Sequence, residues 1–280
     1  MTNPVLEEVR KTADRVGSCD PIWLKNAAGP TINSTEGRQG QDGKELILLH
    51  GLLGALSNWN STFPEMEKFC KPIALQMPIL TAHRSEVKVK ALAALTEYFI
   101  RQRGLGPAAL CGNSLGGHVA LRLYLASPQL VDCMVLTGTS GLYEHTVDAL
   151  PVRPDRKYIK ESMSRVFYDQ QYVTDAAVEE IFQALSGRMR VLNLIHAARS
   201  AKKDNLKSLL KTIKVPVLLI WGEDDLITTM DVAETFHKEL PNSKLVVFKK
   251  CGHAPMIEYP KEFALEVENF LKEHSRNFRS

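Results

Sequence analysis

The stretch AALCGNSLGG, residues 108–117, decides the fold class of this 280-residue chain. Its first four residues, 108–111, are apolar without alternation, which is typical of a parallel β-strand covered on both faces. Residues 112–116 match the pattern G-x-S-x-G, and residues 115–127 have the apolar spacing of a helix. A strand, a sharp turn and a helix in this order predict that Ser114 is presented at the carboxyl end of a parallel sheet.

The rest of the chain repeats this alternation of short apolar runs and longer helical patterns. The alternation predicts a doubly wound, mostly parallel sheet of the α/β class. Turn-rich residues 20–43 leave room for a short antiparallel hairpin before the first parallel strand. Further strands are expected at residues 46–50, 73–77, 133–137, 217–221 and 245–248, and helices at residues 86–103, 115–127, 229–240 and 260–274.

Residues 142–214 interrupt the alternation, because they contain no convincing strand. The insert begins after one predicted strand and ends before the next, so we expect it to cover the carboxyl ends of the strands, where open α/β sheets bind ligands. Four helices are expected within it, at residues 155–168, 174–185, 188–200 and 204–213. The predicted organisation is a helical extension at residues 1–20, an α/β core at residues 21–141 and 215–280, and a helical cap at residues 142–214.

The composition argues against several classes of partner and cofactor. The chain has 35 Lys and Arg against 32 Asp and Glu, a net charge of +3 with the signs interspersed, so we expect neither a nucleic-acid nor a membrane partner. A small-molecule substrate is the expected partner, and the oligomeric state stays open. Five cysteines without a CxxC pair, and no signal-peptide pattern, favour reduced thiols in a cytoplasmic protein. No metal-ligand spacing, GxGxxG motif or P-loop is present, so no metal or cofactor is expected.

The chain supplies partners for Ser114 in the order nucleophile, acid, base. The strand at residues 217–221 runs into Gly222-Glu223-Asp224-Asp225, and the strand at residues 245–248 is followed by the loop that ends in His253. Both loops follow strand ends, where functional sites assemble. We expect His253 to take the proton of Ser114 while a carboxylate orients its ring. Spacing alone does not separate the three carboxylates.

The first parallel strand ends in HGLLG, residues 50–54, which predicts a donor for a developing oxyanion. The backbone N–H of Leu52 is expected to pair with the N–H of Leu115 at the start of the helix after the nucleophile. His50 lies before this donor, at the end of the strand, and is expected to be a structural histidine that holds the loop.

The segments HGLLG, GNSLGG, WGEDD and CGHAP resemble the α/β-hydrolase superfamily over about residues 44–275. Within it, the sequence is similar to the cap-bearing branch of carboxylesterases and carbon–carbon-bond hydrolases. The resemblance implies that the acid is Asp225, the base His253, and that residues 142–214 form the helical cap. Ser114 excludes the haloalkane dehalogenases and epoxide hydrolases of this fold, which use an Asp nucleophile.

Three departures from that branch bear on the substrate. Carbon–carbon hydrolases acting on aromatic ring-fission products usually have HGGGPG in the oxyanion loop and a Trp after the catalytic histidine, whereas this chain has HGLLGA and Ala254. Both differences favour an esterase. Residues 76–86, QMPILTAHRSE, stand where the branch usually has an Asp and a glycine-rich turn, so the pocket wall there is expected to differ.

The leading expectation is a serine hydrolase that cleaves a small, largely apolar carboxylic ester through an acyl-enzyme. The alternatives are a carbon–carbon-bond hydrolase of the meta-cleavage-product type, with the same three residues, and a ligand-sensing receptor or signalling protein on the same fold. Arg188 and Arg190 fit a solvated cap face better than a carboxylate site. Side chains expected to line an apolar pocket are Tyr143, Phe167, Leu192, Ile195 and, beside the base, Met256.

Overall fold

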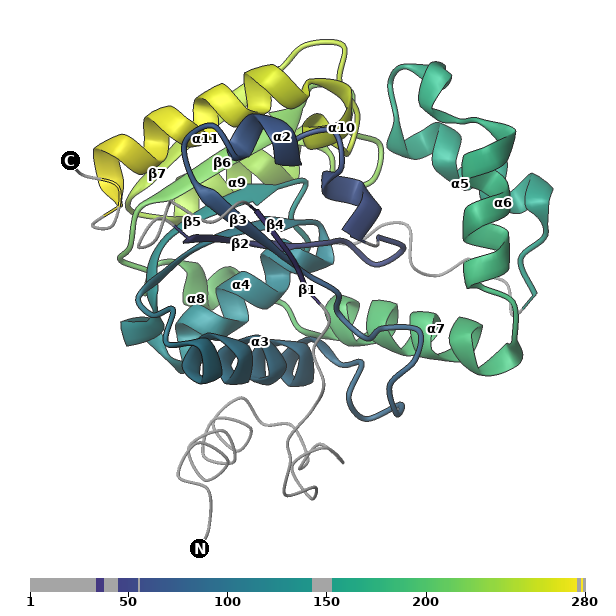
Figure 1. Ribbon diagram of the computed structural model, residues 1–280, viewed down its shortest axis with the longest axis horizontal. Helices are drawn as coiled ribbons and strands as arrows, with labels where there is room; N and C mark the ends of the chain where they lie inside the picture. The colour runs from purple at the N-terminus through teal and green to yellow at the C-terminus, as the bar shows by residue number, and fades with distance from the viewer. Residues whose placement is uncertain (1–33, 38–44, 55, 143–152, 276–277, 279–280) are drawn as a thin grey trace, which may run out of the picture.

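The computed structural model describes residues 34–37, 45–54, 56–142, 153–275 and 278. Within these residues, seven strands form one sheet in the order β1-β3-β2-β4-β5-β6-β7 (Figure 1). Strand β1 runs antiparallel to β3, and every other pair of neighbours is parallel. The strands are β1 (Ser34–Glu36), β2 (Glu45–Leu49), β3 (Lys71–Leu75), β4 (Ala108–Asn113), β5 (Val131–Thr137), β6 (Val217–Gly222) and β7 (Ser243–Phe248).

The predicted α/β class and mostly parallel sheet are confirmed, and each predicted parallel strand is present with its ends shifted by at most two residues. The hairpin expected within residues 20–43 lies largely outside the described residues. Its described part, β1, pairs antiparallel with β3. The predicted helical extension at residues 1–20 also lies outside the described residues.

The central strands are largely apolar because helices cover both faces of the sheet. In β2, Ile47 and Leu49 point to one core cluster while Leu46 and Leu48 point to the other. Successive side chains of a strand face opposite sides, so a strand covered twice needs an apolar residue at every position. The first face carries α3 (Val89–Arg103), α4 (Leu115–Ala126), α8 (Lys207–Leu210) and α9 (Met230–Glu239), and the second carries α2 (Phe63–Met66), α10 (Pro255–Glu258) and α11 (Pro260–His274).

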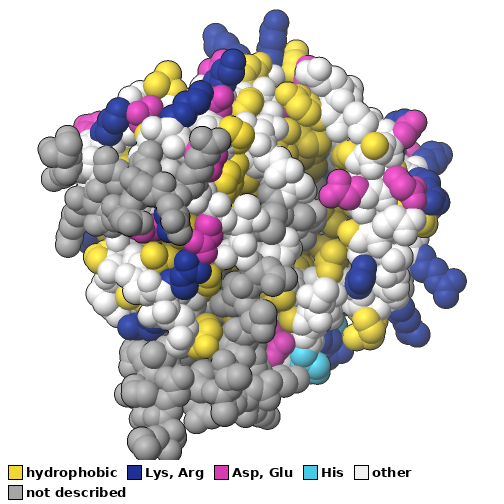
Figure 2. Space-filling model, in the orientation of Figure 1, with side chains coloured by type: hydrophobic (Ala, Val, Ile, Leu, Met, Phe, Trp, Pro, Cys, Tyr) yellow, Lys and Arg dark blue, Asp and Glu magenta, His cyan; other side chains and the backbone are white. Residues whose placement is uncertain are grey.

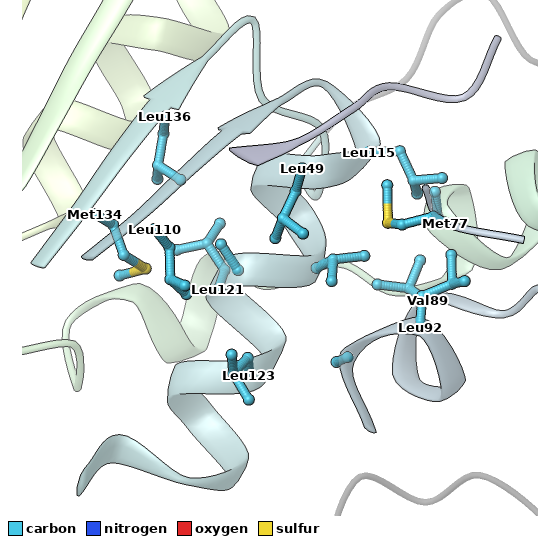
Figure 3. Close-up of a cluster of buried hydrophobic side chains, with 14 of the residues drawn as sticks. Leu49, Met77, Val89, Leu92, Leu110, Leu115, Leu121, Leu123, Met134 and Leu136 are labelled. Carbon is cyan, nitrogen blue, oxygen red and sulfur yellow. The ribbon is translucent and has the colours of Figure 1, made fainter. Parts of the chain in front are cut away.

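The first core cluster fixes the helix that follows Ser114. Figure 3 shows Leu49, Leu110 and Met134 pointing from three adjacent strands toward α4, where Leu121 packs against them. All four side chains are fully buried. Complete burial of such a side chain contributes about 1.5–3 kcal/mol relative to exposure, so this contact holds α4 firmly against the sheet.

Three longer helices lie between β5 and β6, and we call them the cap helices: α5 (Arg156–Val166), α6 (Asp175–Ala184) and α7 (Arg188–Lys203). Helices α5 and α6 form a lobe beside the sheet, and α7 runs back beneath it toward α3 (Figure 1). Asp155 and Thr174 cap the starts of α5 and α6 by accepting hydrogen bonds from backbone N–H groups. The 3₁₀ turns are η2 (Leu56–Trp59), η3 (Pro128–Leu130) and η5 (Gln170–Tyr172).

The strand order locates the ligand crevice. Strand β2 has β3 on one side and β4 on the other, so the chain leaves β2 in one direction and crosses back in the other. In open α/β sheets, ligands bind at the carboxyl ends of the strands where the order reverses in this way. The loops after β2 and β4, which contain Leu52 and Ser114, therefore face each other. Within the described ranges, each helix is too short or too polar to cross a bilayer.

Candidate active site

Ser114 occupies a strained turn between β4 and α4. Its φ is 53° and its ψ is −116°, a conformation that costs free energy for any residue with a Cβ. The turn is possible because glycines flank it: a Cβ on Gly116 would lie 2.1 Å from the carbonyl oxygen of Leu49, and a Cβ on Gly112 would lie 2.5 Å from the backbone of Gly116. The motif thus presents Ser114 at the sheet end, as the sequence predicts.

Asp225 and His253 form a buried hydrogen-bonded pair. The Nδ1 atom of His253 lies 2.8 Å from Oδ2 of Asp225. The same carboxylate accepts hydrogen bonds from the backbone N–H groups of Ile227 (2.8 Å) and Thr228 (2.9 Å) through Oδ1, and from the hydroxyl of Thr228 (3.0 Å) through Oδ2. These bonds fix the carboxylate in one orientation.

Burial separates the three carboxylates that spacing left open. Asp225 is 3% exposed, whereas Glu223 and Asp224 are exposed on the surface of the same loop. The one contact between this triplet and His253 among the described hydrogen bonds is made by Asp225. The structure therefore pairs His253 with the carboxylate that the family resemblance implies.

Two residues that sequence reasoning missed hold His253 in place. The side-chain amide of Asn113 donates to the carbonyl oxygens of His253 and Thr137, both at 3.2 Å, so it links β4 to the histidine. Gly138 has a φ of +50°, and a Cβ there would lie 2.7 Å from Nδ1 of His253. A polar Asn at the end of an otherwise apolar strand was the available signal for the first of these contacts.

Ser114 and His253 open into one cavity of about 910 Å³, which Leu52 and Leu115 also line. Figure 2 shows apolar side chains gathered in the hollow between the lobe of α5 and α6 and the rest of the molecule. Leu115 is the first residue of α4, so its N–H has no acceptor within the helix. A Cβ on Gly51 would lie 3.2 Å from the Cβ of Ser114, which places the Leu52 loop directly against the nucleophile turn. The arrangement can present two N–H groups to an anion beside Ser114.

The predicted pocket residues divide into three groups. Phe167 lines the cavity, and Tyr143 lies outside the described residues. Leu192, Ile195 and Met256 are not among the lining residues, and Met256 is instead fully buried in the second core cluster. For Leu192 and Ile195 the reason is that helical spacing predicts an apolar stripe on α7 but does not predict which side of the stripe faces a cavity. The lining residues of α7 are Arg190, Val191, Leu194, Ala198 and Ala201.

Two arginines of α7 and the segment at residues 76–86 were also considered from the sequence as parts of the cavity wall. Arg190 is exposed, as expected for a solvated face, but it also lines the cavity and donates to the carbonyl oxygen of Ala184 (3.1 Å). Arg188 is exposed and is not a lining residue. The unusual segment at residues 76–86 forms part of the wall, with Gln76, Met77, Pro78, Ile79, Leu80, Thr81, Ala82 and Glu86 facing the cavity.

His50 has a structural role. Its Nε2 accepts from the N–H of Met77 (3.0 Å), and its Nδ1 donates to the carbonyl oxygen of Gly51 (2.8 Å). Burial lowers its pKa to about 4, so the ring stays neutral at pH 7. The histidine thus ties the Leu52 loop to the cavity wall at residues 76–86. Within the described residues, no three His, Cys, Asp or Glu side chains lie close enough to hold a metal ion.

Proteins similar to this chain include hydrolases of two kinds. A 2-hydroxy-6-oxononadienedioate/2-hydroxy-6-oxononatrienedioate hydrolase of Burkholderia vietnamiensis (strain G4 / LMG 22486) is 28% identical over 259 residues, which cover 83% of this chain and 88% of the relative. A pimeloyl-[acyl-carrier protein] methyl ester esterase of Nitrosomonas europaea is 26% identical over 238 residues, which cover 79% of this chain and 93% of the relative.

The fold agrees with this relationship. A solved meta-cleavage product hydrolase from Pseudomonas fluorescens IP01 has a TM-score of 0.76 at 23% identity, covering 86% of this chain and 94% of that one. The family model described as "Alpha/beta hydrolase family" matches residues 46–267, which is most of the chain and includes the turn, both loops and the cap helices. The chain therefore belongs to the alpha/beta hydrolase family.

Proposed function

We propose that this chain is a serine hydrolase that cleaves carboxylic esters with a largely apolar acyl group through an acyl-enzyme intermediate. The observation that carries the proposal is the meeting of three distant segments at one cavity. Ser114 lies on a strained turn, and His253 opens into the same cavity while its ring is held by Asp225 at 2.8 Å. This is the arrangement that nucleophilic catalysis by a hydroxyl requires.

The reaction follows from the hydrogen bonds of the site. Since Nδ1 of His253 donates to Asp225, its Nε2 is free of a proton and takes the one on Ser114 as Oγ attacks the ester carbonyl. The negative charge that develops on the carbonyl oxygen is stabilised by the N–H groups of Leu52 and Leu115. His253 then protonates the leaving alcohol, which breaks the C–O bond. Water, deprotonated by His253, hydrolyses the acyl-enzyme and restores Ser114.

The cavity favours a substrate larger than an acetate ester. At about 910 Å³ it is near the upper end of the ~300–1,000 Å³ range of small-molecule sites. Met163, Val191 and Leu194 line it from the cap helices, and Phe167 lines it from the position directly after α5. Burial of each further methylene is worth about 0.8 kcal/mol, which is a factor of about four in kcat/KM. We therefore expect preference to rise from acetate to medium-chain esters.

A carbon–carbon-bond hydrolase is the second candidate, favoured by one specific observation. Arg190 lines the cavity, and a guanidinium is suited to bind a carboxylate of the substrate. The relative from Burkholderia vietnamiensis is named for the hydrolysis of dioate compounds, which carry such groups. The nucleophile turn and the His253–Asp225 pair would serve that reaction unchanged.

Turnover of p-nitrophenyl acetate, butyrate, hexanoate and octanoate tests the proposal directly. We expect kcat/KM to rise with chain length and turnover to vanish in Ser114→Ala. A fluorophosphonate probe should label the wild-type chain at Ser114 only. A folded wild-type chain that neither labels nor cleaves any of the four esters would refute the esterase. Turnover of a ring-fission dioate that falls strongly in Arg190→Gln, with no ester turnover, would establish the second candidate instead.

A further inference from the structure

The loop that carries His253 depends on contacts outside itself. In this histidine loop, residues 249–253 between β7 and α10, two consecutive backbone N–H groups donate to acceptors outside the loop. The N–H of His253 donates to the carbonyl oxygen of Val166 (2.7 Å), the last residue of α5. The N–H of Gly252 donates to Oε1 of Glu258 (2.7 Å), at the end of α10. A cap helix and Glu258 therefore contribute, together with Asn113, to fixing the backbone position of His253.

The carboxylate of Glu258 joins the histidine loop to the cap. Its Oε1 accepts from Gly252 and lies 3.8 Å from Sγ of Cys251, while its Oε2 accepts from the N–H of Asp169 (2.9 Å). Asp169 directly follows the chain segment that leaves α5. Oε1 of Glu258 thus binds the histidine loop, and Oε2 binds the segment that follows α5. Hydrogen bonds to an ionised acceptor are roughly twice as strong as neutral ones, so a single side chain makes a firm bridge.

The two sides of this bridge are packed backbone against backbone. A Cβ on Gly252 would lie 2.4 Å from the carbonyl oxygen of Val166 and 2.8 Å from the backbone nitrogen of Tyr168. The segment from Val166 to Asp169 therefore cannot move without moving the histidine loop. Val166 and Phe167 also line the cavity, so the part of the cap that touches the substrate is the part that holds the base.

We propose that Glu258 is a positioning residue, whose carboxylate couples the seating of the cap to the alignment of His253 with Ser114. The inference rests on the proposed function, in which His253 is the base. Glu258 is not among the residues that line the cavity, whereas its neighbour Ile257 is. Its replacement should therefore lower kcat and the reactivity of Ser114 and leave KM nearly unchanged.

Glu258→Gln and Glu258→Ala test this role in the full chain. Gln offers one oxygen and one NH₂ group, so in either orientation one of the two backbone N–H groups loses its acceptor. We expect kcat for p-nitrophenyl hexanoate, and the rate of fluorophosphonate labelling, to fall about tenfold in Gln and about a hundredfold in Ala. KM should stay within about threefold. Glu262→Gln, at an exposed position four residues further on, removes a nearby charge and should change neither rate.

Asp169 offers a matched pair on the other side of the bridge. Its φ of −84° is close to the value that proline adopts. Asp169→Ala removes the side chain but keeps the backbone N–H. Asp169→Pro also removes this N–H, which donates the hydrogen bond to Glu258. We expect kcat of the Pro variant to fall several-fold below that of the Ala variant. In a Glu258→Ala background this difference should disappear, because the acceptor is already gone.

Thermal unfolding identifies the variants that are folded at the assay temperature. Folded Glu258 variants with kcat and labelling rates within twofold of wild type would overturn the positioning role. A fall in kcat/KM carried entirely by KM would do the same, because it would make Glu258 a substrate-binding residue. A wild-type chain that reacts with neither the probe nor the esters would overturn the proposed function, and the positioning role with it.

Discussion

Replacing Asp225 by Asn should abolish most activity while leaving the fold intact. Oδ1 of Asp225 accepts from two backbone N–H groups, those of Ile227 (2.8 Å) and Thr228 (2.9 Å). The amide oxygen of the Asn must take this position, because an NH₂ group there would face two donors. The NH₂ group is then forced to the position of Oδ2, where it faces Nδ1 of His253 and the hydroxyl of Thr228.

This orientation reverses the tautomer of His253. With an NH₂ donor opposite it, Nδ1 becomes an acceptor and the ring proton moves to Nε2, which can no longer take the proton of Ser114. A base held in the wrong tautomer costs about 10⁴ in kcat in the Ser-His-Asp template, or about 5 kcal/mol of transition-state stabilisation. Each polar atom around position 225 keeps a partner, so the free energy of unfolding should change by less than about 1 kcal/mol.

The assay compares kcat for p-nitrophenyl hexanoate, the rate of fluorophosphonate labelling and the thermal midpoint of the variant with those of wild type. Asp224→Asn is the control, because that carboxylate is exposed one position earlier in the same loop. We expect it to retain full activity. A folded Asp225→Asn variant with kcat within tenfold of wild type would show that the orientation argument is wrong.

Two further predictions concern backbone space and charge. Gly138→Ala and Gly104→Ala each introduce a Cβ at a positive φ, +50° and +64° respectively, at a cost of about 1 kcal/mol. The Cβ at position 138 would meet His253, whereas nothing lies within 4 Å of the Cβ at position 104. Activity assays should therefore show a loss of more than tenfold for Gly138→Ala alone, and equal losses in both would contradict the steric argument. Burial acts to raise the pKa of the Asp204 carboxyl. Hydrogen bonds from His118 and Arg122 outweigh this effect and lower the pKa to about 2. Because this pKa is depressed, the ionised carboxylate of Asp204 stabilises the fold above about pH 4, and this effect is lost progressively as the pH falls from about 4 through 2. Urea unfolding of wild type and Asp204→Asn should differ by about 1–2 kcal/mol at pH 6, and the difference should shrink below about pH 4 and vanish only below about pH 2. A difference as large at about pH 2 as at pH 6 would exclude the ionised carboxylate as its source.

The sequence was most informative about features that depend on interactions between residues close together in the chain. Continuous apolar runs mark the buried parallel strands, because a strand covered on both faces has no position for a polar side chain. Glycines around Ser114 mark the sharp turn, because no other residue fits at 2.1 Å from the Leu49 carbonyl oxygen. The helices between residues 153 and 210 were also foreseeable from their spacing. The boundaries of a separate cap, at residues 142 and 214, remain a prediction.

Residue periodicity could not settle what faces the cavity. On α7 the apolar stripe is wide enough to cover both the core and the substrate side, and Val191 lines the cavity whereas Leu192 and Ile195, which were expected to do so, do not. Met256 failed for the same reason: its position beside the base in sequence says nothing about the direction of its side chain, which packs in the second core cluster.

The sequence by itself determined the α/β class and the positions of Ser114, Asp225 and His253 at strand ends, because these depend on patterns within ten or so neighbouring residues. Residue spacing left three carboxylates open, and tertiary structure decided that Asp225 meets His253, that Asn113 bonds to it and Gly138 leaves room for its ring, and that Glu258 links its loop to the cap. Each of those contacts joins segments far apart along the chain. Burial and hydrogen-bond geometry between such segments exist only once the sheet has brought its strand ends together.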